Sequence, residues 1–300
     1  MTDPNGLAPL RGRLCRRWPL LRRCLRARPG ALPGALLGAL LVALLPALPV
    51  LAQQEPARTD RRVPLEPTAW PFTAIGRVNV VTGPAHHGHC TGTLVAPRLV
   101  LTAAHCLFDD RIGGYVKPHQ VHFVAGQARD RFGGHAVAQD LRIAPGLALE
   151  RATRPGPRPI TQEMIRHDWA VITLREALDG VKPVPWRLLP GADLPGSRQG
   201  AVVAVAGYAF DRPYLPVIHR GCSARIDVPA PGQLTDLCDS GSGESGAPVL
   251  LLEPDGTAAL VGIHTAVGGG ERVGNAVRAH LGFGVAAAAF APVLDEMARR

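Results

Sequence analysis

Short apolar runs, separated by clusters of glycine and proline, recur along the chain from about residue 67 onward. Such runs with this punctuation are typical of the strands of all-β domains. They fall into two groups, with a proline-rich crossover at 181–200 between them. The predicted strands are 74–81, 92–96, 99–103, 121–125 and 170–174 in the first group, and 201–206, 222–228, 247–252 and 258–264 in the second.

One segment has a helical pattern instead. An alanine run followed by apolar residues at helical spacing predicts a helix over 285–299. The pattern therefore predicts an all-β domain at 67–300, made of two packed halves. The first half spans about 67–180, and the second half with its C-terminal helix spans 201–300.

The first 52 residues are typical of a signal peptide rather than of a folded element. Eight arginines between Arg11 and Arg28 precede an apolar stretch over 31–51, and Val50-Leu51-Ala52 suits a signal peptidase. About 20 apolar residues can also span a bilayer, so an uncleaved anchor is the alternative. Three prolines within the stretch weaken a spanning helix. The leader predicts a secreted or periplasmic protein.

The leader also accounts for most of the positive charge. It holds eight of the 33 basic residues and one of the 24 acidic ones, so 25 basic and 23 acidic residues remain. The formal charge of +9 for the whole chain therefore indicates little about partners. No basic stripe with interleaved aromatic residues remains either, which argues against nucleic-acid binding.

Three short motifs offer an imidazole, a carboxylate and a hydroxyl. Thr-Ala-Ala-His-Cys contains His105, His-Asp-Trp-Ala-Val contains Asp168, and Gly-Glu-Ser-Gly-Ala-Pro contains Ser245. A serine hydroxyl needs an adjacent base to become a nucleophile, and the base needs an acid to orient it. We expect His105 and Asp168 in these roles, with the backbone N–H groups of Gly243 and Ser245 as the oxyanion hole.

The order of the motifs excludes one other class of serine hydrolase. In α/β-hydrolases the nucleophile stands in Gly-x-Ser-x-Gly, and the triad follows the order Ser, Asp, His. Here the order is His, Asp, Ser, and Ala247 stands two residues after Ser245. A nucleophile elbow is therefore not expected.

The segments Cys90–Val95, Leu101–Cys106, Asp168–Val171 and Gly243–Pro248 resemble those of trypsin-like (chymotrypsin-fold) serine proteases. The chain is most similar to the bacterial glutamyl-endopeptidase-like branch, which has a later Gly-Ile-His strand, here 262–264. The resemblance extends over roughly 67–290. It implies two packed antiparallel barrels of the six-stranded type, with the triad at their seam and no cofactor or metal.

Four cysteines remain beyond the leader, an even number that suits an oxidising compartment. We expect bridges between Cys90 and Cys106 and between Cys222 and Cys238, because each pair is 16 residues apart and lies near a candidate catalytic residue. The first pair also matches the bridge that the family has beside its catalytic histidine. The alternative is that Cys222 and Cys238 are free thiols.

The residues of the specificity pocket give two conflicting signals. Asp239 stands six residues before Ser245, where trypsin-like members place the carboxylate that attracts Arg or Lys. His264 and Ser242 occupy positions that glutamate-specific relatives use to bind a substrate carboxylate. The Gly-Ile-His strand favours the acidic preference. The alternative for His264 is a hydrogen-bonded histidine in the pocket wall.

Residues 53–66 are polar and proline-punctuated, which suits a linker or a short propeptide. Arg61-Arg62 before Val63 is a candidate cleavage point, so the mature chain is expected to begin at Val63 or at Gln53. In many family members a new N-terminal amine pairs with an acid beside the nucleophile. That acid is more usually Asp, whereas this chain has Glu244.

A histidine tract precedes Cys90, with His86, His87 and His89. Imidazole suits zinc or copper, but a histidine cluster on a loop is more often without a function. The sequence therefore predicts an exported serine endopeptidase that forms an acyl-enzyme on protein or peptide substrates. We expect a monomer without nucleic acid, cofactor, metal or lasting membrane association. A catalytically silent binding protein with a protease fold is the alternative.

Overall fold

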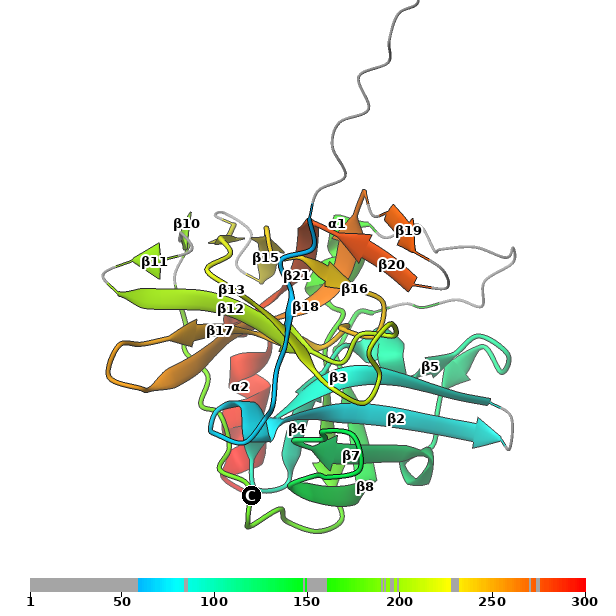
Figure 1. Cartoon of the computed structure of the whole chain (residues 1–300). Helices are drawn as coiled ribbons and strands as arrows, with labels where there is room; N and C mark the ends of the chain where they lie inside the picture. The colour runs from blue at the N-terminus through cyan, green and yellow to red at the C-terminus, as the bar shows by residue number, and fades with distance from the viewer. Residues whose placement is uncertain are drawn as a thin grey trace, which may run out of the picture. The chain divides into compact units, whose positions relative to one another are not determined.

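The computed structural model describes residues 59–83, 86–147, 149, 161–189, 191, 193–194, 197–198, 200–227, 232–269, 271–273 and 276–300. The predicted leader at 1–52 lies outside the described residues. Within the described ranges, no helix has the length and hydropathy needed to cross a membrane. Strands dominate, as the sequence predicted, and they form two main units (Figure 1).

The first unit is a closed antiparallel barrel of six strands in the order β2-β3-β4-β9-β8-β7. Its strands are β2 (Ile75–Gly83), β3 (His86–Ala96), β4 (Leu99–Thr102), β7 (Val121–Ala125), β8 (Gly134–Ile143) and β9 (Ala170–Leu174). Five match predicted strands, although β3 begins earlier than predicted. The sequence missed β8, because a register shift between Ala138 and Asp140 breaks the alternation that reveals a strand.

The second unit is an antiparallel sheet with the strand order β1-β13-β12-β17-β18-β21-β15-β14-β10, and β11 pairs with β12. The order is a half-barrel, since no pairing closes it within the described residues. Its strands are β1 (Val63–Pro64), β10 (Asp193–Leu194), β11 (Ser197–Arg198), β12 (Ala201–Gly207), β13 (Val217–Arg220), β14 (Ala224–Ile226), β15 (Gln233–Asp236), β17 (Ala247–Leu252), β18 (Ala258–Gly268) and β21 (Leu281–Ala286).

Smaller elements complete the described chain. The helices are η1 (Phe72–Ala74), η2 (Ala104–Leu107), η3 (Pro118–Gln120), α1 (Gln162–Arg166) and α2 (Ala287–Ala298). The remaining strands are the hairpin β5 (Phe108–Asp109) and β6 (Gly114–Tyr115), and the sheet β16 (Ser240–Gly241), β20 (Ala276–Ala279) and β19 (Glu271–Val273). Helix α2 is the one predicted over 285–299, and β21 takes the first residues of that range.

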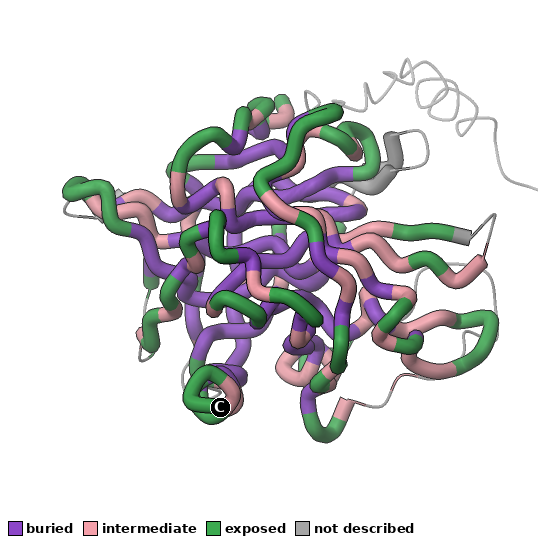
Figure 2. Tube along the Cα trace, turned by 90° about the horizontal axis from the view of Figure 1, so that it is seen from below, coloured by how far each residue is buried: buried purple, intermediate pink, exposed green. Residues whose placement is uncertain are grey.

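A continuous apolar core joins the two units. Leu101 and Phe123 of the first barrel belong to the same buried cluster as Leu250 of the second sheet and Phe290 of α2. In Figure 2 the buried residues, drawn in purple, lie along the parts of the trace that pass through the middle of the molecule. Burial of this kind is the dominant favourable contribution to folding. The two units therefore pack as one body, which fixes the loops at their junction.

The segment predicted as a linker is partly built into the second sheet. Strand β1 pairs with β13 through Val63 opposite Ile218, and the Leu65 N–H donates to the Pro216 carbonyl at 2.8 Å. Within the predicted crossover at 181–200, β10 and β11 also pair with strands of this sheet. Both connecting segments thus contribute edge strands.

Candidate active site

His105 lies on the short helix η2, immediately after strand β4 of the first barrel. Its ring Nδ1 is 2.6 Å from Oδ2 of Asp168, and its backbone N–H donates to Oδ1 of the same carboxylate at 2.8 Å. Two bonds to one carboxylate fix both the position and the rotation of the ring. The Nδ1 contact requires the proton on Nδ1, so Nε2 is the basic nitrogen of the neutral ring.

Asp168 follows α1 and stands two residues before strand β9. The next residue, Trp169, is buried and packs edge-to-face on Phe290 of α2, with 6.3 Å between ring centroids. The Asp168 side chain is 12% exposed, whereas that of His105 is 37% exposed. The acid is therefore shielded by packing, while the imidazole remains open to a ligand.

Ser245 stands on a tight turn between β16 and β17. Gly243 and Gly246 on either side have φ angles of +95° and +83°, a region that disfavours other residues. A Cβ at Gly246 would also overlap the carbonyl oxygen of Thr91. The Thr91 N–H donates to the Ser245 carbonyl at 2.9 Å, so β3 of the first barrel holds this turn of the second unit.

The turn brings Ser245 to the same cleft as His105. Both residues, with Ser242 and Gly243, line a cavity of about 610 Å³. The sulfur of Cys106 lies 3.8 Å from His105 Nε2 and 3.9 Å from the Ser245 carbonyl oxygen. The Nε2 atom of His105 and the carbonyl oxygen of Ser245 are therefore both within 4 Å of the same sulfur atom. Among the described residues, no acceptor takes a hydrogen bond from the backbone N–H of Gly243 or Ser245.

Both expected disulfides are present, and the first of them lies at the site. Cys90 and Cys106 are bonded along one wall of the cavity, and Cys222 and Cys238 are bonded in the second unit. The Cys90 and Cys106 sulfurs and a His105 nitrogen lie within 4.8 Å of one another, a spacing that a metal ion would need. The two sulfurs are bonded to each other, so neither is a thiolate ligand.

The histidine tract lies on strand β3 rather than on a loop. His87 is exposed, the His86 side chain is outside the described residues, and His89 Nε2 lies 3.1 Å from the Tyr208 carbonyl. Burial is the main cause that lowers the pKa of His89 to about 4. His89 is therefore a neutral donor to the second unit at neutral pH.

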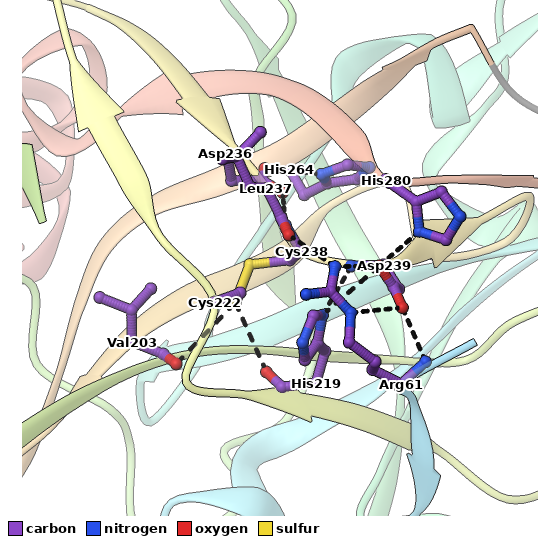
Figure 3. Close-up of a disulfide and its surroundings, with 10 residues drawn as sticks. All are labelled: Arg61, Val203, His219, Cys222, Asp236, Leu237, Cys238, Asp239, His264 and His280. Carbon is purple, nitrogen blue, oxygen red and sulfur yellow. Dashed lines mark hydrogen bonds and ion pairs between the residues drawn. A yellow bond between two sulfur atoms is a disulfide. The ribbon is translucent and has the colours of Figure 1, made fainter. Parts of the chain in front are cut away.

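Asp239 is buried, and its carboxylate is the centre of a cluster of ion pairs. One oxygen contacts Arg61 Nη2 at 2.7 Å and His280 Nδ1 at 2.6 Å, and the other accepts from the Arg61 backbone N–H at 2.7 Å (Figure 3). The Asp239 N–H itself donates to His219 Nδ1 at 2.7 Å. Although burial opposes ionisation, the bonds from Arg61 and His280 hold the pKa of Asp239 below its usual range.

His264 forms a second buried pair. Its Nδ1 lies 3.0 Å from Asp236 Oδ2, and both side chains are at most 2% exposed. Burial alone would lower the pKa of His264, but the neighbouring Asp236 carboxylate raises it overall. Of the three pocket candidates, only Ser242 lines the cavity that contains His105 and Ser245.

Two cation–carboxylate contacts escaped the sequence analysis. Arg61 binds Asp239, and Arg62 binds Glu244, the residue before Ser245. The partners are 178 and 182 residues apart in the chain, so no local spacing could have indicated them. The only sequence signal was the Arg-Arg pair itself, which we interpreted as a cleavage point.

Known proteins share both the sequence pattern and the fold. The chain is 29% identical to the cercarial protease of Schistosoma mansoni, over 41% of this chain and 44% of that protein. It is 29% identical to human serine protease 23, over 54% of this chain and 43% of that protein. The chain thus spans less than half the length of these curated relatives.

Two solved structures resemble the fold. One is a Glu endopeptidase in complex with MPD, with a TM-score of 0.57, 20% identity, and coverage of 81% of this chain and 98% of that chain. The other is the protease Anisep from Arthrobacter nicotinovorans, with a TM-score of 0.53, 17% identity, and coverage of 75% and 93%. The family model of the trypsin-like peptidase domain matches residues 90–263, more than half of the chain. The chain therefore belongs to the trypsin-like serine peptidases.

Proposed function

We propose that this chain is a serine endopeptidase that cleaves peptide bonds through an acyl-enzyme formed on Ser245. The observation that carries the proposal is the His105–Asp168 contact of 2.6 Å, in a cleft that Ser245 also lines. In that contact, His105 Nδ1 donates a hydrogen bond to Asp168, which leaves His105 Nε2 as the base.

In the proposed mechanism, Ser245 Oγ attacks the carbonyl carbon of the scissile bond while His105 Nε2 takes the hydroxyl proton. The carbonyl oxygen becomes an oxyanion, which the backbone N–H groups of Gly243 and Ser245 stabilise. The imidazolium, stabilised by Asp168, then returns the proton to the leaving amine. Water repeats the sequence on the acyl-enzyme and releases the second product.

We infer that the residue before the cut is not Arg or Lys. A basic side chain would need a free carboxylate, but both oxygens of Asp239 already bind Arg61, and one also binds His280. The Gly-Ile-His strand at 262–264, together with Ser242 in the cavity beside Ser245, favours an acidic residue. A peptide panel varied at this one position tests the inference. Preferred cleavage after Glu is expected, and preferred cleavage after Arg or Lys contradicts it.

Export belongs to the same proposal. Two disulfides persist in oxidising compartments and are rare in the cytosol. Fractionation of cells that make the full chain should place the protein beyond the cytoplasmic membrane. Recovery of the folded protein in the reduced cytosolic fraction would contradict export.

Incubation of the purified protein with a proteome-derived peptide library tests the activity. The wild-type chain should cut the library, whereas Ser245→Ala should leave it intact while melting at a similar temperature. A folded wild-type chain that cuts nothing would favour the alternative, a protease-fold binding protein. Cleavage by Ser245→Ala would reject the assignment of the nucleophile.

A further inference from the structure

One arginine of the N-terminal segment is buried against the turn that carries Ser245. The Arg62 side chain is only 3% exposed, and its Nη1 lies 2.5 Å from Glu244 Oε2. The same guanidinium lies 3.0 Å from Asp60 Oδ2 and 3.5 Å from Asp211 Oδ2. A single cation thus gathers three carboxylates, and the most buried of them, Glu244, stands beside the nucleophile.

Glu244 needs this cation because its carboxyl group is shielded from solvent. Its side chain is 1% exposed, and a buried carboxylate without a partner is strongly unfavourable. Burial raises the pKa of Glu244 to about 7, against the opposing charges of Arg62 and His264. Without Arg62, the carboxyl group must either take up a proton or rotate toward solvent.

The position of Glu244 in the turn links this choice to the oxyanion hole. Glu244 lies between Gly243 and Ser245, the two residues whose N–H groups are proposed to bind the oxyanion. Its backbone N–H donates to Gly241 at 3.1 Å, and its carbonyl accepts from Ala247 at 2.9 Å. Because the Glu244 side chain is buried, its carboxylate can reach solvent only if the backbone of the turn shifts, and such a shift would break these bonds and move the N–H groups of Gly243 and Ser245.

The segment that carries Arg62 is anchored before and after the arginine. Arg61 binds Asp239 through its backbone and its guanidinium, and Val63 begins strand β1 on β13. Val63 itself is 54% exposed. A cut between Arg62 and Val63 would therefore leave a new amine at the surface and detach the cation from Glu244.

We propose that Arg62, carried on the uncut N-terminal segment, is the positioning residue that holds Glu244 inward and keeps the turn 241–246 in its oxyanion-binding form. This inference rests on the proposed peptidase function. It implies that the active chain keeps residues 60–62 and that cleavage after Arg62 inactivates it. The sequence prediction of Val63 as the mature N-terminus is incompatible with it.

The test compares Arg62→Gln, Arg62→Lys and a matched control, Arg187→Gln, in the full chain. Arg187 forms a half-exposed ion pair with Glu253 at 2.6 Å, and such pairs contribute little. With a peptide substrate, Arg62→Gln should lower kcat by about 10²-fold, the scale of losing oxyanion stabilisation, with KM little changed. Arg62→Lys should recover most of kcat, and Arg187→Gln should match the wild type.

A double variant covers the case in which Arg62→Gln does not fold. Replacing both members of a buried ion pair is often nearly neutral, whereas removing one is costly. Arg62→Gln with Glu244→Gln should therefore melt above Arg62→Gln alone. Melting losses that simply add would overturn the proposed coupling.

Two results separate the failure of this inference from that of the proposed function. An active wild type whose Arg62→Gln variant keeps its kcat overturns the role of Arg62 alone, whereas an inactive wild type overturns the peptidase proposal. N-terminal sequencing of the active species completes the test. A start upstream of Arg62 supports the inference, and active protein that starts at Val63 overturns it.

Discussion

The two units of this protein hold the candidate active-site residues by different means. The first barrel is closed, and its described interior is apolar apart from threonines and Asp168. The second unit is a sheet that the described pairings leave open, and it buries Asp236, Asp239 and Glu244, each paired with a histidine or an arginine. Two of those partners, Arg61 and Arg62, come from the N-terminal segment. The proposed base, His105, therefore lies on an apolar scaffold, whereas the proposed nucleophile, Ser245, lies on a scaffold that depends on ion pairs.

The largest effect should come from the one carboxylate of the first barrel that orients the base. Asp168→Asn should lower kcat by about 10⁴-fold, because the amide favours the wrong tautomer of His105. The melting temperature should change little, since Asn has the same shape and keeps an oxygen that accepts from the His105 backbone N–H. Steady-state kinetics on a peptide substrate measures the loss. A reduction of less than tenfold would remove Asp168 from the proposed triad.

Breaking an ion pair of the second unit should lower stability strongly. Asp236→Ala should reduce the free energy of unfolding by about 3–5 kcal/mol, because it strands a buried histidine. Since the folded-state pKa of His264 is raised, the pair stabilises most below about pH 6.5. That contribution is lost as the pH rises through the folded-state pKa. Urea unfolding at pH 6 and pH 9 should show the larger loss at pH 6.

A core truncation in the first barrel is the matched comparison. Leu101→Ala should reduce the free energy of unfolding by about 2–5 kcal/mol, because it leaves a cavity in a fully buried cluster. Its cost should be the same at pH 6 and pH 9, since the change removes only apolar contacts. A pH dependence as steep as that of Asp236→Ala would erase the distinction between the two units.

The smallest effect should come from His89, at the junction of the two units. Its folded-state pKa of about 4 lies below the usual 6.5, so the unfolded chain binds the proton more tightly. Its contribution to stability is full above about pH 6.5 and is lost as the pH falls through 4. His89→Gln should keep a donor for the Tyr208 carbonyl and flatten the stability profile over this range. An unchanged profile in urea titrations would assign the slope to other groups.

The sequence predicted those parts of the fold whose pattern is local. Strands β7, β9 and β17 have the predicted bounds, because each is a short segment rich in apolar residues between breaks. Strand β15 was missed because its sequence, Gln-Leu-Thr-Asp, lacks a run of apolar residues. The last two residues of strand β21, Val285 and Ala286, were interpreted as the start of the helix, since they continue into the alanine run.

The candidate site divides in the same way. The motifs around His105, Asp168 and Ser245 contain their own turn chemistry, so the sequence indicated them directly. The contacts of Arg61 with Asp239 and of Arg62 with Glu244 join residues that are 178 and 182 positions apart. These charges come together only in the folded chain. In the sequence, an Arg-Arg pair that is a processing site cannot be distinguished from an Arg-Arg pair that forms buried ion pairs.

The central claim is that His105 activates Ser245 across the cleft between the two units. Reaction of the folded protein with a fluorophosphonate, followed by peptide mass mapping, tests it most directly. The account predicts one adduct, on Ser245, whose formation slows by several orders of magnitude in His105→Ala. An adduct on another residue, or a rate that His105→Ala leaves unchanged, would contradict it.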